Sequence, residues 1–239
     1  MTDHAPTAPY LIAPRYLAGP DTSLAVAIGD RLRAAGWRSD AYRGAVVYAR
    51  REAGGLLEAV HIPNGAGGGG KCPAAGWEFT ARPGPGTPST WSVRFTPATP
   101  PELPAALASA LTEEAADSGP GAKPHYLRPP LPPAQATMPL DAAGWMRDIG
   151  TAESAWYAPG QQAVVVTPVT ADEHGDDGAS WMLAARRATD LQVLWLALAH
   201  PATPTHLVRA LCAEISDPAP VPRHRLPDPE VGELTLTQL

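Results

Sequence analysis

The chain has 239 residues, an apolar content of 44% and a formal net charge of −6. Its length is enough for two small hydrophobic cores of roughly 100 residues each, and we expect two rather than one. The acidic balance argues against tight, sequence-independent nucleic-acid binding, which draws on many Lys and Arg contacts to phosphate, although a local basic strip is compatible with it.

Neither a targeting segment nor a membrane span is indicated. Residues 1–6 lack a basic region and an apolar run, and no stretch approaches roughly 18 continuous apolar residues. We therefore expect a cytoplasmic protein without membrane contacts. Cys72 and Cys212 have no second pair nearby, so neither a disulfide framework nor a zinc site is expected, and both should be free thiols.

The first repeat of the chain opens with a predicted strand over Tyr10–Leu17 and a helix over Ser23–Ala35 that ends at Gly36. Short stretches rich in Val, Tyr, Trp and Phe then predict four strands, over Gly44–Ala49, Leu56–Pro63, Gly76–Ala81 and Thr90–Thr96. In the closing helix we expect Thr99 as N-cap and Glu102 as its capping-box partner.

The second repeat departs most at its front, where only Pro139–Ala143 separates a proline run from Gly144. Its first helix is therefore expected to be a turn or absent. Its closing helix keeps Thr203 and Pro204 but has His206 at the position of the Glu. Strands are predicted over Ala155–Ala158, Gln161–Thr167, Ala179–Ala185 and Gln192–Ala199.

The evidence for duplication is direct. Trp91–Pro100 returns as Trp195–Pro204, and the apolar stripe of an amphipathic helix recurs beyond it at the same offset. Further matches lie upstream: Tyr10-Leu11 with Tyr126-Leu127, Ala35-Gly36-Trp37 with Ala143-Gly144-Trp145, and Trp77 with Trp181.

The fold class predicted from this repeat is α+β, with two tandem, pseudo-symmetric repeats docked side by side. Each repeat is expected to be a four- to five-stranded antiparallel sheet with a C-terminal helix. The predicted boundaries are 9–114 for the first repeat, 115–124 for a linker, 125–217 for the second repeat and 218–239 for a Pro-rich tail.

Two segments outside the expected sheets allow alternative interpretations. Pro129–Pro133 is predicted to be extended, as a stiff connector rather than as a ligand for an aromatic groove. The alternation in Leu234–Thr237 is compatible with a strand added to a sheet edge, but we favour fraying in solution.

Three segments carry a family resemblance: Tyr10–Gly19, Ala34–Trp37, and Trp91 followed by Phe95–Pro100 and a Leu/Ala-rich helix. Together they resemble the streptomycete proteins catalogued as domain of unknown function 317, which usually carry the domain twice. The resemblance spans about residues 9–218. The second copy lacks the Arg-Tyr-Leu-Ala-Gly continuation after its Tyr-Leu pair. The resemblance implies an actinobacterial intracellular protein and supplies no catalytic residue.

The candidate reactive motifs are weak. Gly65–Cys72 has the spacing of a phosphate-binding loop, but Cys72 stands where Ser or Thr would hold magnesium and no helix fits before the next strand, so a hairpin loop is favoured. Asp172–Asp177 offers oxygen ligands but fits no calcium-loop spacing, so a solvated hairpin tip is favoured. His200 and His206 are expected at surface or boundary positions, and no catalytic triad, metal site or cofactor is assigned.

Six of the seven Trp residues recur in matched pairs, as core residues of a duplicated fold do. Core packing is therefore favoured. The alternative is a sheet face on which Trp77 and Trp91 stack single-stranded bases while Arg82 and Arg94 bind phosphate.

We expect a non-catalytic binding or scaffold protein that acts through contacts with an unidentified protein partner. Long Pro-rich segments, an acidic second half and the lack of an assigned reactive constellation favour this function. Single-stranded nucleic-acid binding on the sheet face of the first repeat is one alternative, and an enzyme with a polar pocket between the repeats is another. The sequence leaves the oligomeric state open.

Overall fold

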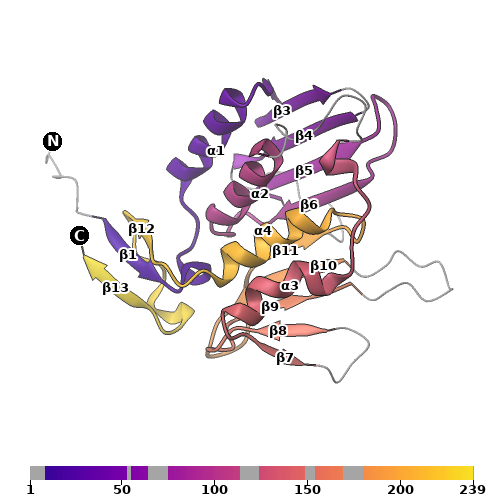
Figure 1. Ribbon diagram of the computed structural model, residues 1–239. Helices are drawn as coiled ribbons and strands as arrows, with labels where there is room; N and C mark the ends of the chain where they lie inside the picture. Colours follow the sequence, from indigo (N-terminus) through magenta and orange to yellow (C-terminus); the bar gives the residue numbers. More distant parts are fainter. Residues whose placement is uncertain are drawn as a thin grey trace, which may run out of the picture.

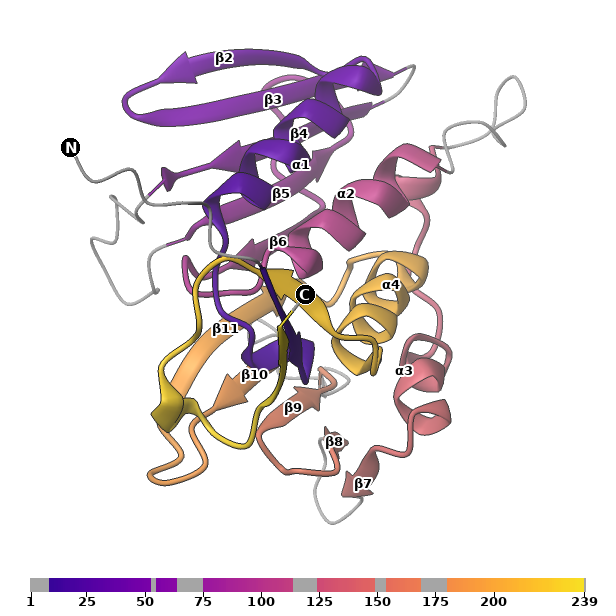
Figure 2. The ribbon, with the colours of Figure 1, turned by 90° about the vertical axis from the view of Figure 1, so that its left-hand side faces the viewer.

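A single ten-stranded antiparallel sheet forms the body of the protein (Figure 1). The computed structural model describes residues 9–52, 55–63, 75–113, 124–148, 154–168 and 180–238. The strand order is β2-β3-β4-β5-β6-β11-β10-β9-β8-β7, so each repeat supplies five neighbouring strands. Four helices lie together on one face of the sheet, and the described residues place no helix on the opposite face (Figure 2).

The two half-sheets have the same layout. The first consists of β2 (Arg38–Tyr42), β3 (Ala45–Glu52), β4 (Gly55–His61), β5 (Trp77–Arg82) and β6 (Trp91–Phe95). The second consists of β7 (Met146–Asp148), β8 (Ala155–Tyr157), β9 (Ala163–Val166), β10 (Trp181–Arg186) and β11 (Val193–Ala199). The helices are α1 (Thr22–Ala34), α2 (Glu102–Glu113), α3 (Pro133–Ala142) and α4 (Thr205–Ser216). In the described part of the chain, every helix is too short or too polar to span a bilayer.

The half-sheets meet at β6 and β11, which pair antiparallel with Arg94 opposite Leu198. On the covered face, α2 packs against α4 across this junction. Buried side chains from both repeats, such as Trp91 and Trp195, consequently belong to one continuous hydrophobic core. The expectation of two separate cores is wrong, because the paired strands and packed helices bury the edges that would divide them.

A reciprocal exchange of short segments locks the repeats together. The 3-10 turn η1 (Arg15–Leu17) precedes the first repeat, yet the Tyr16 carbonyl accepts a hydrogen bond from Trp195 Nε1 of the second repeat at 2.7 Å. The turn η4 (His125–Leu127) does the reverse, because the Tyr126 carbonyl accepts from Trp91 Nε1 at 2.6 Å. The structural counterpart of Tyr126-Leu127 is therefore Tyr16-Leu17 and not Tyr10-Leu11.

Local sequence signals account for the ends of the first helices. The Asp21 carboxylate caps α1 by accepting from the amides of Ser23 and Leu24 at 2.9 and 3.3 Å. Gly36 and Gly144 follow α1 and α3 with positive φ angles of 86° and 75°, a conformation that favours glycine. The Ala-Gly-Trp match between the repeats thus marks the same turn in both.

Four elements differ from the sequence-based prediction. The edge strands β2 and β7 were not predicted, because all their residues are exposed and no apolar alternation marks them. Helix α3 replaces the expected turn, with Pro133 in its first turn, where the missing amide is harmless, and Pro139 in its interior. The opening strand β1 (Tyr10–Ala13) is shorter than expected, because the chain turns into η1.

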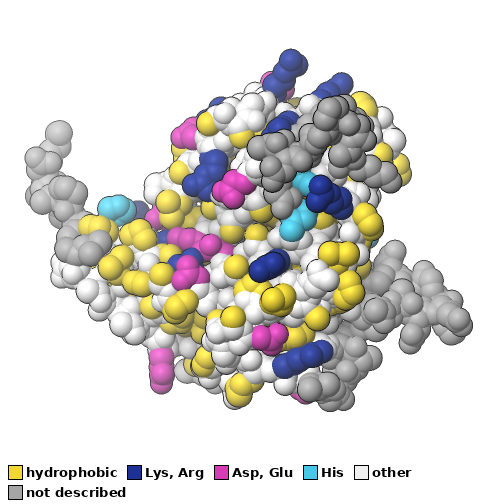
Figure 3. All heavy atoms as spheres, in the orientation of Figure 1, with side chains coloured by type: hydrophobic (Ala, Val, Ile, Leu, Met, Phe, Trp, Pro, Cys, Tyr) yellow, Lys and Arg dark blue, Asp and Glu magenta, His cyan; other side chains and the backbone are white. Residues whose placement is uncertain are grey.

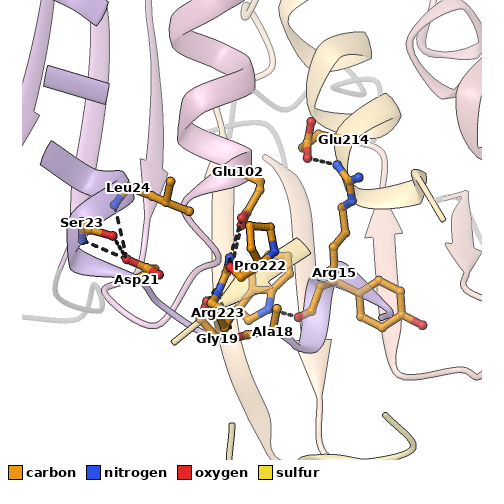
Figure 4. A network of polar contacts seen from close by, with 12 residues as sticks. Arg15, Ala18, Gly19, Asp21, Ser23, Leu24, Glu102, Glu214, Pro222 and Arg223 are labelled. Carbon is orange, nitrogen blue, oxygen red and sulfur yellow. Dashed lines mark hydrogen bonds and ion pairs between the residues drawn. The ribbon is translucent and has the colours of Figure 1, made fainter. Parts of the chain in front are cut away.

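The capping box expected at the start of α2 does not form. The two carboxylate oxygens of Glu102 instead accept hydrogen bonds from Arg223, each at 2.7 Å (Figure 4). Arg223 is 2% exposed and also donates to the carbonyl of Ala18. Glu102 therefore anchors the C-terminal tail rather than closing on Thr99.

The tail pairs with the N-terminal segment instead of fraying. Strands β12 (Val221–Arg223) and β13 (Thr235–Gln238) flank β1 in a separate three-stranded antiparallel sheet. Arg15 adjoins this sheet and forms an ion pair with Glu214 (Figure 4). It forms a second ion pair with Asp217 at 2.7 Å. The favoured expectation of a frayed tail is wrong, because β1 offers the tail two strand edges and buried Arg223 holds it.

Removing either indole hydrogen bond between the repeats should destabilise the fold. Trp91→Phe leaves the buried Tyr126 carbonyl without its donor, so we expect the free energy of unfolding to fall by about 1–3 kcal/mol in urea denaturation. Trp37→Phe is the matched control, because the Trp37 indole nitrogen has no hydrogen-bond partner among the described residues. Equal losses would show that lost volume, rather than the hydrogen bond, determines the cost.

Glu214 should make stability depend on pH. Burial raises the pKa of Glu214, despite the opposing Arg15 guanidinium. As the pH rises, the unfolded chain releases this proton at the ordinary Glu pKa but the folded chain holds it longer, so folding becomes less favourable across that window. Glu214→Gln does not titrate. The unfolding free energy of wild type relative to this variant should fall as the pH rises above the ordinary pKa of Glu, about 4.3; a constant difference would contradict the raised pKa.

Candidate functional surface

The sheet face opposite the helices, here called the open face, is a broad surface that the described helices leave uncovered. Side chains alternate between the two faces along each strand. In β5, Trp77 and Phe79 are buried on the helix side, whereas Glu78 and Thr80 lie on the open face. Residues paired across strands share a face, so the registers identify every other member of the open face.

Charged and aliphatic side chains share the open face of the first half-sheet, where Leu56 pairs with Arg82 and Val60 with Glu78 across the strands. Arg82 Nε lies 2.9 Å from Glu58 Oε2, and Arg94 Nε lies 2.9 Å from Glu78 Oε1. The four side chains are between 25% and 47% exposed. Pairs of this kind add little stability, but they keep a solvated surface neutral and compatible with water.

The second half-sheet carries aliphatic side chains at the matched positions. The matched Trp residues that begin β5 and β10, and those on β6 and β11, fix the correspondence between the repeats. The replacements are Val164 for Glu58, Met182 for Glu78, Ala184 for Thr80, Leu196 for Ser92 and Leu198 for Arg94. We call this set, together with Val166, the apolar half-face; Ala184 within it is buried, and Val166 matches Val60, which is aliphatic as well. It continues toward the sheet edge through Tyr157 and the 50% exposed Met146.

Arg186 stands at the border of the apolar half-face, at the position that Arg82 has in the first repeat. Because Val164 replaces Glu58, the carboxylate that would pair with Arg186 is missing from the sheet. Arg186 Nε donates to the Gln161 carbonyl at 2.8 Å, and its guanidinium carbon lies 5.8 Å from the centre of the Tyr157 ring. No ion pair of Arg186 occurs among the described residues.

The four residues proposed from the sequence as a binding face do not share a face. Trp77 and Trp91 are 5% and 1% exposed and lie beneath the helices. Arg82 and Arg94 lie on the open face, each paired with a glutamate. Successive side chains of a strand point to opposite faces, so residues an odd number apart lie on different faces. This applies to Trp77 and Arg82 on β5 and to Trp91 and Arg94 on β6. The structure thus places the tryptophans in the core.

A cleft of about 640 Å³ lies where η1 and the tail meet the β8–β9 and β10–β11 turns. Its described lining offers no Ser, Cys or His; its polar side chains are those of Tyr16, Gln161, Gln162, Arg186, Arg187 and Glu233. Gln162 is already engaged, since its Nε2 donates to the Val231 carbonyl at 2.6 Å. Burial raises the pKa of Tyr16, so its hydroxyl stays protonated near neutral pH. This lining lacks a nucleophile with an adjacent base.

The other singled-out residues also lack a reactive setting. Cys212 is buried, and burial raises the pKa of its thiol to about 12, which makes it a poor nucleophile. His200 is exposed and its Nδ1 accepts from the Ala202 amide at 3.0 Å. No metal-binding group of three His, Cys, Asp or Glu residues occurs in the described ranges. Gly65–Gly70, Cys72 and Asp172–Asp177 lie outside the described residues.

Sequence reasoning missed the apolar half-face for a specific reason. The Val164–Val166 run is equally typical of a strand buried on both faces, so hydrophobicity alone does not reveal an open side. The usable signal was the comparison between the repeats. Aligning Trp77 with Trp181 places Glu78 against Met182, a loss of charge at a position that alternates away from the core.

The fold and this surface define a class: a two-layer α+β protein of two tandem repeats whose shared sheet has one open face with unlike halves. The model of the SPDY domain of unknown function, DUF317, matches the chain twice, at residues 54–116 and 159–221. These matches cover more than half of the chain, which belongs to this family. Each match contains three strands and the closing helix, β4 to α2 and β9 to α4. No curated protein and no solved structure matches the chain.

The protein should not bind nucleic acid through the first half-sheet. Arg82 and Arg94 are neutralised by glutamates, and on the helix-covered side positive and negative side chains are interspersed (Figure 3). We expect no saturable binding of labelled single- or double-stranded DNA and RNA by fluorescence anisotropy, even at low salt. Saturable, salt-sensitive binding that Arg82→Gln and Arg94→Gln weaken would contradict this expectation.

Proposed function

We propose that the protein is a non-catalytic binding module that holds a partner protein against the apolar half-face. The observation that carries the proposal is the contrast between matched positions of one continuous face. Where the first repeat has Glu58, Glu78 and Arg94, the second repeat has aliphatic side chains.

Folding does not account for these aliphatic residues. In the first half-sheet the same strands, paired in the same register, carry charge at the matched positions, so this architecture accepts polar side chains there. Aliphatic groups on an open face leave water only when another surface covers them. A contiguous apolar area bordered by polar residues is typical of a protein interaction site.

The scaffold behind the apolar half-face is well held. On the covered side, α3 packs against α4 and α4 against α2, and the junction of β6 with β11 joins the half-sheet to the first repeat. Side chains on paired strands are positioned more closely than those on loops. A partner would therefore meet a preformed surface, which lowers the entropic cost of binding.

Site-specific photo-crosslinking in the native host tests this proposal with a matched control. A benzophenone amino acid is placed either at Met182, on the apolar half-face, or at Glu78, the matched position of the first repeat. We expect a covalent adduct with a host protein from the Met182 position and none from the Glu78 position, because only the former lies under the partner.

A second variant provides the control for specificity. Val164→Glu with Leu196→Ser installs side chains that the first repeat already has at the matched positions 58 and 92, so the chain should fold normally. We expect these substitutions to abolish the adduct from the Met182 position. Equal adducts at both probe positions, or none at either, would overturn the proposal.

A further inference from the structure

We infer that the occupant of the apolar half-face is an amphipathic helix of about three to four turns that brings a carboxylate to Arg186. This inference rests on the proposed function and specifies the partner's chemistry. It draws on the dimensions of the surface, on its charge, and on how the same sheet is covered on its other side.

The dimensions match one helix that lies across the strands. At about 4.8 Å per strand spacing, the second half-sheet is about 19 Å wide from β7 to β11. A helix of about 13 residues is about 20 Å long. The apolar half-face, with an area of roughly 300 Å², is well below the roughly 800 Å² that each partner of a stable protein dimer usually buries. A second copy of this chain is therefore a poor occupant.

The charge of the border also argues against a second copy. Arg186 lacks the glutamate that its counterpart Arg82 has. A covering apolar surface would bury this cation, which is unfavourable unless the covering chain supplies a carboxylate to pair with it. The open face of a second copy offers Glu58 and Glu78, but each is already paired with an arginine. Among the described residues, Glu233 lines the same cleft as Arg186 but forms no ion pair with it, so a partner that brings a carboxylate to Arg186 supplies a pairing that these residues do not make.

The covered face shows what packs on this sheet. Across the β6–β11 junction, α4 buries Leu207, Leu211 and Ile215, and α2 buries Leu103, Leu107 and Leu111. Both stripes have the four-residue spacing of an amphipathic helix. The partner helix should repeat this spacing and carry Asp or Glu beside its apolar stripe, within reach of Arg186.

Selection from a random peptide library displayed on phage tests the inference with the full chain as bait. We expect enriched peptides to share apolar residues at three- to four-residue spacing and an adjacent Asp or Glu. Their synthetic copies should gain helical circular dichroism on mixing with the protein. Enriched peptides without this spacing, or bound in an extended form, would overturn the inference.

The role of Arg186 is measured by fluorescence anisotropy with the enriched peptides. Arg186→Gln should weaken binding about tenfold, whereas Arg82→Gln, the matched control, should leave it unchanged. Replacing the peptide's acidic residue by Lys should weaken its binding to the wild-type protein. The same Lys peptide should bind the Arg186→Glu variant more tightly than the acidic peptide does. Equal effects of the two Gln variants would overturn the charge assignment.

Two further outcomes separate this inference from the proposed function. If the peptides lack a helical pattern but lose binding to the Val164→Glu/Leu196→Ser variant, the half-face is a binding site and the helix is the wrong occupant. If the peptides bind that variant as tightly as they bind the wild type, both proposals fail. A concentration-dependent dimer of the wild type in analytical ultracentrifugation, absent from the variant, would identify a second copy as the occupant and overturn the inference.

Discussion

Two hydrogen bonds, from Trp195 to the Tyr16 carbonyl and from Trp91 to the Tyr126 carbonyl, determine how the repeats are joined. A pseudo-twofold axis passes between the antiparallel strands β6 and β11, where the matched residues Arg94 and Leu198 pair. Each of the two bonds joins the turn that precedes one repeat to the central strand of the other. The β6–β11 pairing, the α2–α4 contact and the single core join the repeats as well. The sheet is continuous because β6 pairs with β11, and its open face is therefore one surface rather than two.

That continuity makes the asymmetry of the open face meaningful. The covered face is alike in both halves, with matched Trp residues buried under matched helices. The open face differs at several matched positions, such as Glu78 and Arg94 against Met182 and Leu198, while Arg82 and Val60 keep their type in Arg186 and Val166. Packing constrains the first face in both copies, whereas contact with solvent or with a partner constrains the second. The two copies therefore share their architecture and differ in their surface chemistry.

Much of this architecture was predictable from local signals. The repeat, most strands, the left-handed Gly turns and the buried Trp residues follow from periodicity and composition, which act over a few neighbours. The rest depends on contacts between distant residues. Glu102 looks like a capping residue until Arg223, far along the chain, binds it, and the tail becomes a strand only because β1 lies beside it. The apolar half-face was predictable only by comparing matched positions, because a strand's hydrophobicity does not say which of its faces is covered.

The crossing of η1 and η4 also bears on the origin of the fold. Each repeat, with its own turn and its own central-strand Trp, contains both halves of the interlock, and the present chain closes both bonds between the repeats. Two copies related by a twofold axis would satisfy both bonds and build the same ten-stranded sheet. The present chain thus has the form of a homodimer whose subunits have been fused. In a chain of this form the two halves of the open face can differ, which they cannot do in a symmetric dimer of identical chains.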